Sequence, residues 1–313
     1  PACTDAAEAA LPNAPLVHPS LGSNIAFARE FVRGDAPAAM SSAHIRIKAR
    51  FRFFRKAALA LESRSYLAEF NGGRRELTLH SSTQVPGIVR ESLVELLDLP
   101  GNSVRVIAPD VGGGFGAKTS VYPEEILVCV LARRLGKPVK YTSDRLEDLS
   151  STSQAFDEVI DAELGVAADG TLLALSADVT GDVGAYSIYP WTAAIEPVQV
   201  VSFMPGPYRL ANYFGKVRGV MTPKILLGPY RGVGRPVSTF VMERLIDMAA
   251  RKLGIDPVQM RLKNLVRRDE FPYKAASGII WDRSAFIECL DKACDVLDYP
   301  GLRAMQQQAR TEG

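Results

Sequence analysis

Cysteine is scarce in this chain, and its few cysteines follow no metal-binding spacing. The four of them form no CxxC or CxxxxC set: Cys3, Cys129, Cys289 and Cys294. This pattern argues against an iron–sulfur cluster or a zinc site on the chain. Single cysteines scattered through 313 residues are typical of reduced core thiols, so we expect a reducing compartment and a cytoplasmic location.

Long apolar runs and an excess of one charge are also lacking. No hydrophobic run approaches the ~20 residues of a transmembrane helix, so we expect no membrane span. The 37 basic and 35 acidic residues leave a net charge of +2, which favours no nucleic-acid or acidic-membrane partner. There is no initiator Met, no signal-peptide pattern and no internal repeat. The hydrophobic content of 47% is enough for a large core and for more than one domain.

What is present is the periodicity of a mixed α/β chain. Alternation of apolar and polar residues, with glycine turns at 71–74 and 168–170, predicts strands at 45–53, 67–70, 76–79, 139–142, 159–166 and 172–179. Apolar residues at helical spacing predict helices at 85–97, 124–135, 237–253 and 256–265. Gly254 is expected to cap the third of these helices, and Asp256 with Pro257 to begin the fourth.

Glycines are concentrated in one loop, Val-Gly-Gly-Gly-Phe-Gly-Ala-Lys at 111–118. The loop follows a strand-like segment at 103–109 and precedes a helix that starts near Tyr122. Bare backbone at such a strand–turn–helix junction can approach an anion, a phosphate or an oxo group. Phe115 is the bulky residue among the glycines and is expected to project into the space they leave.

Two further segments add specificity to the glycine loop. His-Ser-Ser-Thr-Gln-Val-Pro at 80–86 closes a strand and opens a helix, and Gly-Pro-Tyr-Arg-Gly-Val-Gly-Arg-Pro at 228–236 precedes the long helix. In this order and spacing, the three segments resemble the molybdenum-binding large subunit of the xanthine dehydrogenase, aldehyde oxidase and carbon monoxide dehydrogenase family. The resemblance extends over about residues 15–300. We expect the three segments to converge in space, because functional loops gather at the ends of rigid elements.

The resemblance implies an α+β fold of mixed sheets with packed helices, as in the molybdopterin-binding domains of aldehyde oxidase and xanthine dehydrogenase. It also implies an internal fragment of a longer polypeptide. Residues 1–44 would be a connecting segment after a separate N-terminal domain, and their first 25 residues lack periodicity. Residues 45–313 would form the first half of the molybdopterin-binding region, as two interleaved α/β subdomains.

The implied activity is hydroxylation of a small molecule with oxygen taken from water, at a molybdenum–molybdopterin cofactor in its cytosine dinucleotide form. Catalytic roles fall on Gln84 and Arg231, cofactor contacts on Gly113, Gly114, Phe115, Gly116 and Arg231, and the substrate pocket on Phe115, Thr119, Tyr230 and Val233. No residue of the chain is expected to ligate the metal directly. The general-base glutamate belongs to a C-terminal half of the subunit, and iron–sulfur and FAD subunits would accept the electrons.

Each of these residues also has a plain structural interpretation. Gln84 could bond the backbone at the start of a helix, and Arg231 could form an ordinary ion pair. Lys118 is expected to face solvent or a phosphate, and Glu62 to pair with an arginine on a strand.

Departures from the family pattern restrict the substrate. Purine-oxidising members carry a glutamate where this chain has Thr119, and an arginine that the segment 193–197 does not offer. Copper-containing carbon monoxide dehydrogenases have a cysteine where this chain has Gly232. The resemblance therefore implies an aldehyde or an N-heterocycle as substrate, and the residues do not separate the two.

Two interpretations from other classes remain open. The first is a dinucleotide-binding Rossmann unit. Its pattern is imitated by a strand at 104–108, glycines at 112 and 114 with Ala117, a helix, a second strand at 139–142 and Asp144. The chain could also be a non-catalytic module that helps to assemble a larger complex.

Overall fold

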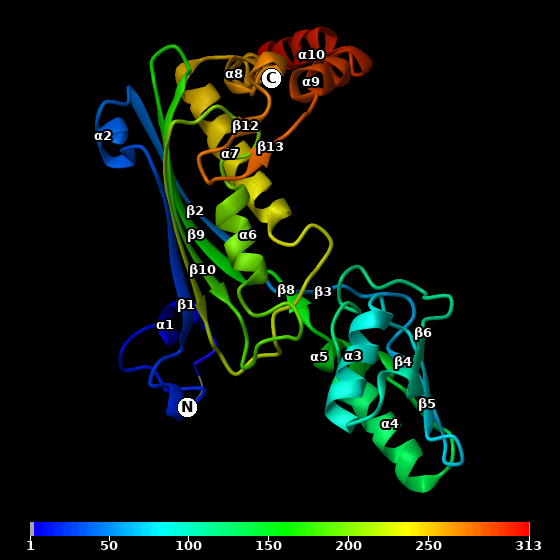
Figure 1. Cartoon of the computed structure of the whole chain (residues 1–313). Helices are drawn as coiled ribbons and strands as arrows, with labels where there is room; N and C mark the ends of the chain where they lie inside the picture. The colour runs from blue at the N-terminus through cyan, green and yellow to red at the C-terminus, as the bar shows by residue number, and fades with distance from the viewer. Residues whose placement is uncertain (1–2, 313) are drawn as a thin grey trace.

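The computed structural model describes residues 3–312, which form two lobes that lie side by side (Figure 1). The larger lobe is built on a five-stranded sheet of order β1-β11-β10-β9-β2, with β10 and β11 parallel and the other neighbours antiparallel. Its strands are β1 (Ile25–Arg33), β2 (Ile45–Phe53), β9 (Glu158–Val166), β10 (Leu172–Asp182) and β11 (Asn212–Val220).

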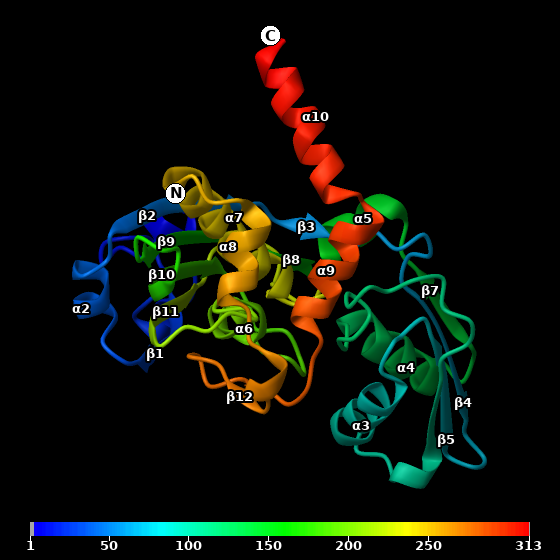
Figure 2. The same cartoon turned by 90° about the horizontal axis from the view of Figure 1, so that it is seen from above.

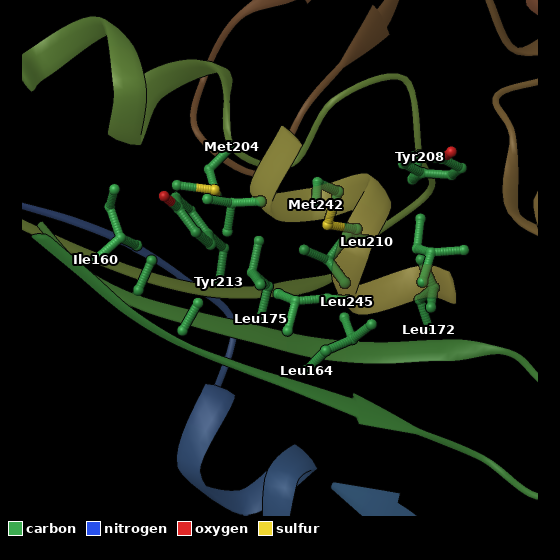
Figure 3. Close-up of a cluster of buried hydrophobic side chains, with 14 of the residues drawn as sticks. Ile160, Leu164, Leu172, Leu175, Met204, Tyr208, Leu210, Tyr213, Met242 and Leu245 are labelled. Carbon is green, nitrogen blue, oxygen red and sulfur yellow. The ribbon is translucent and has the colours of Figure 1, made fainter. Parts of the chain in front are cut away.

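Helices α6 (Ile195–Phe203) and α7 (Arg235–Leu253) cover one face of this sheet, and α8 (Pro257–Asn264) continues along α7. Alternate residues of β9, namely Ile160, Ala162 and Leu164, point to these helices and are fully buried or nearly so. Figure 3 shows Leu164 and Leu175 of the sheet facing Met242 and Leu245 of α7. The short helix α2 (Ala36–Ser41) packs on the opposite face.

The smaller lobe contains a four-stranded sheet of order β6-β5-β4-β7. Its strands are β4 (Ser65–Asn71), β5 (Glu76–Ser81), β6 (Val104–Ile107) and β7 (Val139–Thr142). Helices α3 (Pro86–Leu97) and α4 (Pro123–Leu135) bury their apolar sides against it, around Leu79, Leu93 and Cys129. Both sheets are mixed and carry packed helices, so the expected α+β class is confirmed.

The chain leaves the larger lobe after β2 and returns to it at β9. The two-stranded pairing of β3 (Lys56–Ala57) with β8 (Gln154–Ala155) joins the outgoing and returning segments between the lobes (Figure 2). Helix α5 (Arg145–Ser151) lies on the return path. Past α8, the small β12 (Tyr273–Lys274) and β13 (Ile280–Trp281) precede α9 (Phe286–Val296) and α10 (Tyr299–Thr311).

Most of the predicted elements are confirmed, and two of them, 45–53 and 139–142, have the predicted bounds. Gly254 adopts the left-handed C-cap conformation, and the Asp256 carboxylate accepts the Val258 N–H as an N-cap. The expectation of a connecting segment over residues 1–44 is wrong for its second half. Ile25–Arg33 is strand β1, which pairs along its length with β11, and α1 (Ala6–Ala9) and α2 add short helices.

The Rossmann interpretation is contradicted by the sheet order. A dinucleotide-binding βαβ unit places the strands on either side of its helix next to each other. Here β6 and β7, which precede and follow α4, lie at opposite edges of the sheet with β5 and β4 between them. The glycine loop also ends before α4 begins at Pro123, so it does not form the helix N-terminus.

Among the described residues, no helix is both long and apolar enough to cross a membrane. The cysteines are free thiols. Cys129 lies in the core of the smaller lobe, whereas Cys289 is exposed on α9 and Cys3 and Cys294 are partly exposed, so the expectation of core thiols holds for Cys129 alone.

Candidate functional site

Three loops from the two lobes meet next to one cavity. Gln84 lies in the first loop, between β5 and α3; the second is the glycine loop after β6, and the third, residues 228–234, precedes α7. The Gly116 N–H donates to Gln84 Oε1 at 3.0 Å, and the Arg231 N–H donates to the Phe115 carbonyl at 2.9 Å. The three predicted segments therefore converge, with the glycine loop between the other two.

Two glycines allow this close approach. A Cβ on Gly114 would lie 2.3 Å from Gln84 Oε1, inside contact distance. Gly116 has φ of +102°, and a Cβ there would lie 2.6 Å from the Pro229 carbonyl oxygen. Any larger residue at 116 would therefore meet both an unfavourable backbone conformation and the third loop.

The plain interpretation of Gln84, a hydrogen bond to the backbone at the start of α3, is wrong. Its side chain accepts a hydrogen bond from the glycine loop instead. Its backbone N–H donates to the Lys118 carbonyl at 2.9 Å, which anchors the residue at a second point. With Oε1 accepting from Gly116, the donating Nε2 end of the amide has no partner among the described residues. A hydrogen-bond donor on the cavity wall is thus available to a bound group.

Arg231 is exposed and lines the same cavity. Among the described residues its guanidinium forms no ion pair, and no carboxylate lines the cavity around it, so the ion pair considered for it is not formed. Its backbone holds the third loop to the glycine loop, while its charge stays available to an anion or a metal-bound oxygen ligand.

The cavity has a volume of about 610 Å³, within the range of small-molecule sites. The predicted residues Gln84, Gly114, Phe115, Gly116, Thr119, Tyr230, Arg231 and Val233 all line it. Gly113 does not. It lies behind the Phe115 ring, and a Cβ on it would be 3.2 Å from Phe115 Cε2.

Four lining residues were not among the predicted site residues, namely Trp191, Ile195, Gln199 and Pro229, although Pro229 lies in the predicted segment 228–236. Three of them belong to α6 or to the turn before it, a helix that was not predicted. One signal was available, since Trp191 is one of only two tryptophans in the chain and stands next to the 193–197 segment.

Two residues of the cavity wall have a strained backbone. Phe115 has φ of 51° and Val233 has φ of 43°, although neither is glycine and Val233 is β-branched. Such conformations are rare in side-chain-bearing residues and persist where the surrounding structure imposes them. Both residues line the cavity, so strain and site coincide.

A pair of buried carboxyl groups, Glu196 of α6 and Glu158 of β9, lies next to the third loop. Glu196, in the first turn of α6, accepts the Phe156 N–H at 2.8 Å. Burial raises the pKa of Glu196 to about 7, against the lowering effect of this hydrogen bond. Burial, together with the Glu196 charge, raises the pKa of the adjacent Glu158 well above its usual range. At least one of the two carboxyl groups is therefore protonated at neutral pH.

Another buried carboxyl group lies beneath the first loop. Glu125 accepts the Ser81 hydroxyl at 2.6 Å and the Tyr122 N–H at 3.0 Å. Burial raises its pKa to about 7. It connects the end of β5, three residues before Gln84, to the start of α4.

Lys118 does not face solvent or a phosphate, as the sequence suggested. It is buried, with 4% of its surface exposed, and its Nζ lies 2.8 Å from Glu62 Oε2. The same Glu62 oxygen accepts the Gly112 N–H at 2.8 Å, so the partner of Glu62 is a lysine of the loop and not an arginine. Both residues hold the glycine loop in place.

The residues present fit a cofactor with oxygen ligands and an anionic group. Bare glycine backbone, an amide donor at Gln84 and the Arg231 guanidinium border one cavity. Among the described residues, no group of three or more His, Cys, Asp or Glu is placed to hold a metal ion.

Comparison with known proteins agrees with this geometry. Residues 17–265 match the molybdopterin cofactor-binding domain. The chain is 34% identical to the nicotine 6-hydroxylase large subunit of Paenarthrobacter nicotinovorans over 90% of its length, and to the carbon monoxide dehydrogenase large chain of Hydrogenophaga pseudoflava over 80%. It spans about a third of the length of these relatives, 34% and 32%.

The structural comparison extends over the whole chain. Quinoline 2-oxidoreductase from Pseudomonas putida 86 superimposes with a TM-score of 0.95 at 31% identity, covering 100% of this chain and 40% of that one. The chain therefore belongs to the molybdopterin cofactor-binding domain family, the molybdenum-binding part of the xanthine dehydrogenase, aldehyde oxidase and carbon monoxide dehydrogenase enzymes.

Proposed function

We propose that this chain forms the wall of a molybdenum hydroxylase active site that oxidises an aldehyde or an N-heterocycle. The observation that carries the proposal is the orientation of Gln84. Because the Gly116 N–H occupies Oε1, the amide presents its donor end, as a group holding an oxo ligand must. When bound, the molybdenum–molybdopterin cofactor would supply the oxidative chemistry of hydroxylation with water-derived oxygen.

The roles of the other residues follow from their positions. Arg231 would stabilise negative charge beside the cofactor, and the backbone of Gly114, Phe115 and Gly116 would face it. Gly113 would act indirectly, by supporting Phe115. Thr119, Tyr230 and Val233 would border the substrate. We further propose the cytosine dinucleotide form of the cofactor.

A complete active site would also need parts of the protein beyond the described residues. The lining formed by residues 3–312 contains no carboxylate, so the proposal places the general base in another part of the large subunit. Electrons would pass to iron–sulfur and FAD subunits. Gly232 stands where a copper site would need cysteine, which supports a reaction without copper.

The test is a pair of Gln84 variants of the full protein, assayed for molybdenum content and for dye-linked oxidation of aldehydes and N-heterocycles. Gln84→Glu keeps an acceptor for the Gly116 N–H but loses the donor. Removing one such donor commonly lowers kcat roughly 10²–10³-fold. We expect losses of this size in Gln84→Glu and in Gln84→Leu.

Two results would contradict the proposal. One is a wild-type protein that contains no molybdenum when purified from cells that make the cofactor. The other is full turnover in both Gln84 variants.

A further inference from the structure

Trp191 and Thr119 are joined across the cavity wall. The Trp191 Nε1–H donates to the Thr119 carbonyl at 2.9 Å and lies 3.1 Å from the Thr119 hydroxyl oxygen. That hydroxyl in turn donates to the Gly116 carbonyl at 2.6 Å. The hydrogen-bond donors of both side chains are therefore used within the protein, so neither side chain offers a free donor to a ligand in the cavity that both of them line.

The turn that carries Trp191 is fixed from several sides. The Thr192 N–H donates to the Ile188 carbonyl at 2.9 Å, and the Val121 N–H donates to the Tyr189 carbonyl at 3.2 Å. Thr192 has φ of 74°, a strained conformation for a β-branched residue. These contacts fix the turn before α6 and with it the position of the Trp191 indole.

The remaining substrate-facing surface is also mainly apolar. Phe115, Ile195, Tyr230 and Val233 line it, and the Tyr230 ring packs edge-to-face on Phe156 with centroids 5.7 Å apart. Gln199 adds an amide whose Oε1 is buried without a hydrogen-bond partner. Gln84 and Arg231 of the same cavity are assigned to the cofactor, so a ligand with several exocyclic donors and acceptors would lose more hydrogen bonds to water than Gln199 alone could replace.

We propose that Trp191 determines specificity at this site, and that the ligand is a planar, uncharged aromatic ring system with few polar substituents, packed against the indole. The inference rests on the proposed function and narrows its substrate class. Aromatic rings prefer such offset or edge-on packing, which adds to the gain from apolar burial. Thr119 contributes by holding the indole in place through its carbonyl group.

The experiment compares two probes on the complete assembly that contains this chain. Quinoline is a bare two-ring heterocycle, and xanthine is a two-ring purine with several polar groups. Binding is measured by equilibrium dialysis without an electron acceptor, so that turnover stops, and kcat and KM are measured separately with a dye acceptor. We expect the wild-type protein to bind quinoline at least tenfold more tightly than xanthine.

Trp191→Ala is expected to weaken quinoline binding roughly tenfold, seen in Kd and KM more than in kcat. Trp191→Phe keeps a ring and is expected to restore most of the affinity, which separates ring packing from a folding defect. Trp281→Ala is the matched control. Trp281 donates to the Gly206 carbonyl and is absent from the cavity lining, so quinoline Kd should not change.

Tighter binding of xanthine than of quinoline by the wild type would overturn the inference, as would an unchanged quinoline Kd in Trp191→Ala. Failure of the proposed function gives a different result. In that case no probe is oxidised, while quinoline still binds in a Trp191-dependent manner.

Discussion

At the scale of single residues, the site depends on atoms that are absent as much as on those present. Gly114 and Gly116 leave room for Gln84 and for the third loop, and their neighbour Phe115 is held in a left-handed conformation. These positions were predictable because several glycines stand close together in the sequence. The hydrogen bond from the Gly116 N–H to Gln84 was not predictable, since it joins residues 32 apart in sequence.

The two glycines are expected to respond differently to alanine. In Gly114→Ala the new Cβ meets the end of the flexible Gln84 side chain, which can move, so the Tm should change little while molybdenum content and activity fall. In Gly116→Ala the Cβ meets the Pro229 backbone at a strained φ, and we expect roughly 2 kcal/mol or more of lost stability. Thermal unfolding and metal analysis of both variants measure this contrast. Equal losses of stability would contradict the packing described for the loop.

At the scale of elements, α6 connects the cavity to buried carboxyl groups. Its first turn holds Glu196, and its exposed side contributes Ile195 and Gln199 to the lining. The pKa of Glu196 is raised to about 7 from 4.5 by burial. Folding therefore favours the protonated Glu196 carboxyl group. The contribution of Glu196 to the free energy of unfolding is present in full below pH 4.5 and is lost as the pH rises through about 7.

Glu196→Gln is expected to reduce this pH dependence. The Gln amide oxygen can still accept the Phe156 N–H, but it carries no charge to desolvate. At pH 8 the variant should be more stable than the wild type, by at most on the order of 3 kcal/mol, and at pH 4.5 the two should be close. The measurement is Tm at the two pH values, with the exposed Glu95→Gln as control. A variant destabilised equally at both values would show that Glu196 is charged in the folded protein.

How much of the fold was predictable differs from element to element. β2 was predicted to the residue because its apolar residues alternate with basic ones that pair with Glu163 and Asp161 on β9. β1 was missed because it is an edge strand, exposed along most of its length, whose residues show no clean alternation. α6 was missed because it is apolar on several sides and contains Pro197, so no amphipathic stripe marks it. Because α6 was not predicted, Gln199 was not among the predicted site residues.

At the scale of the whole molecule, the site lies where the two lobes meet. Gln84 and the glycine loop come from the smaller lobe, whereas Trp191 and Arg231 come from segments that lead into helices of the larger one (Figure 1). The chain crosses between the lobes at β3 and β8, which pair with each other. A cofactor at this junction would be held by both lobes.

The scarcity of cysteine leads to a prediction about the assembly. A molybdenum hydroxylase must pass electrons onward, and the four cysteines show no cluster-binding spacing. The complete protein, isolated under mild conditions from its source, should therefore carry iron–sulfur and flavin subunits, detected by mass spectrometry and by iron and flavin analysis. A preparation that turns over substrate with dye but is made without iron or flavin partners in the cell would argue against this assembly.

The position of molybdenum in crystals of the complete holoenzyme, located by anomalous scattering at the molybdenum edge, tests directly whether this cavity is the cofactor site. We expect one strong peak in the cavity bordered by Gln84, Phe115 and Arg231, with the Gln84 amide donating to a ligand of the metal. A peak elsewhere in the molecule, with this cavity filled only by solvent, would contradict it.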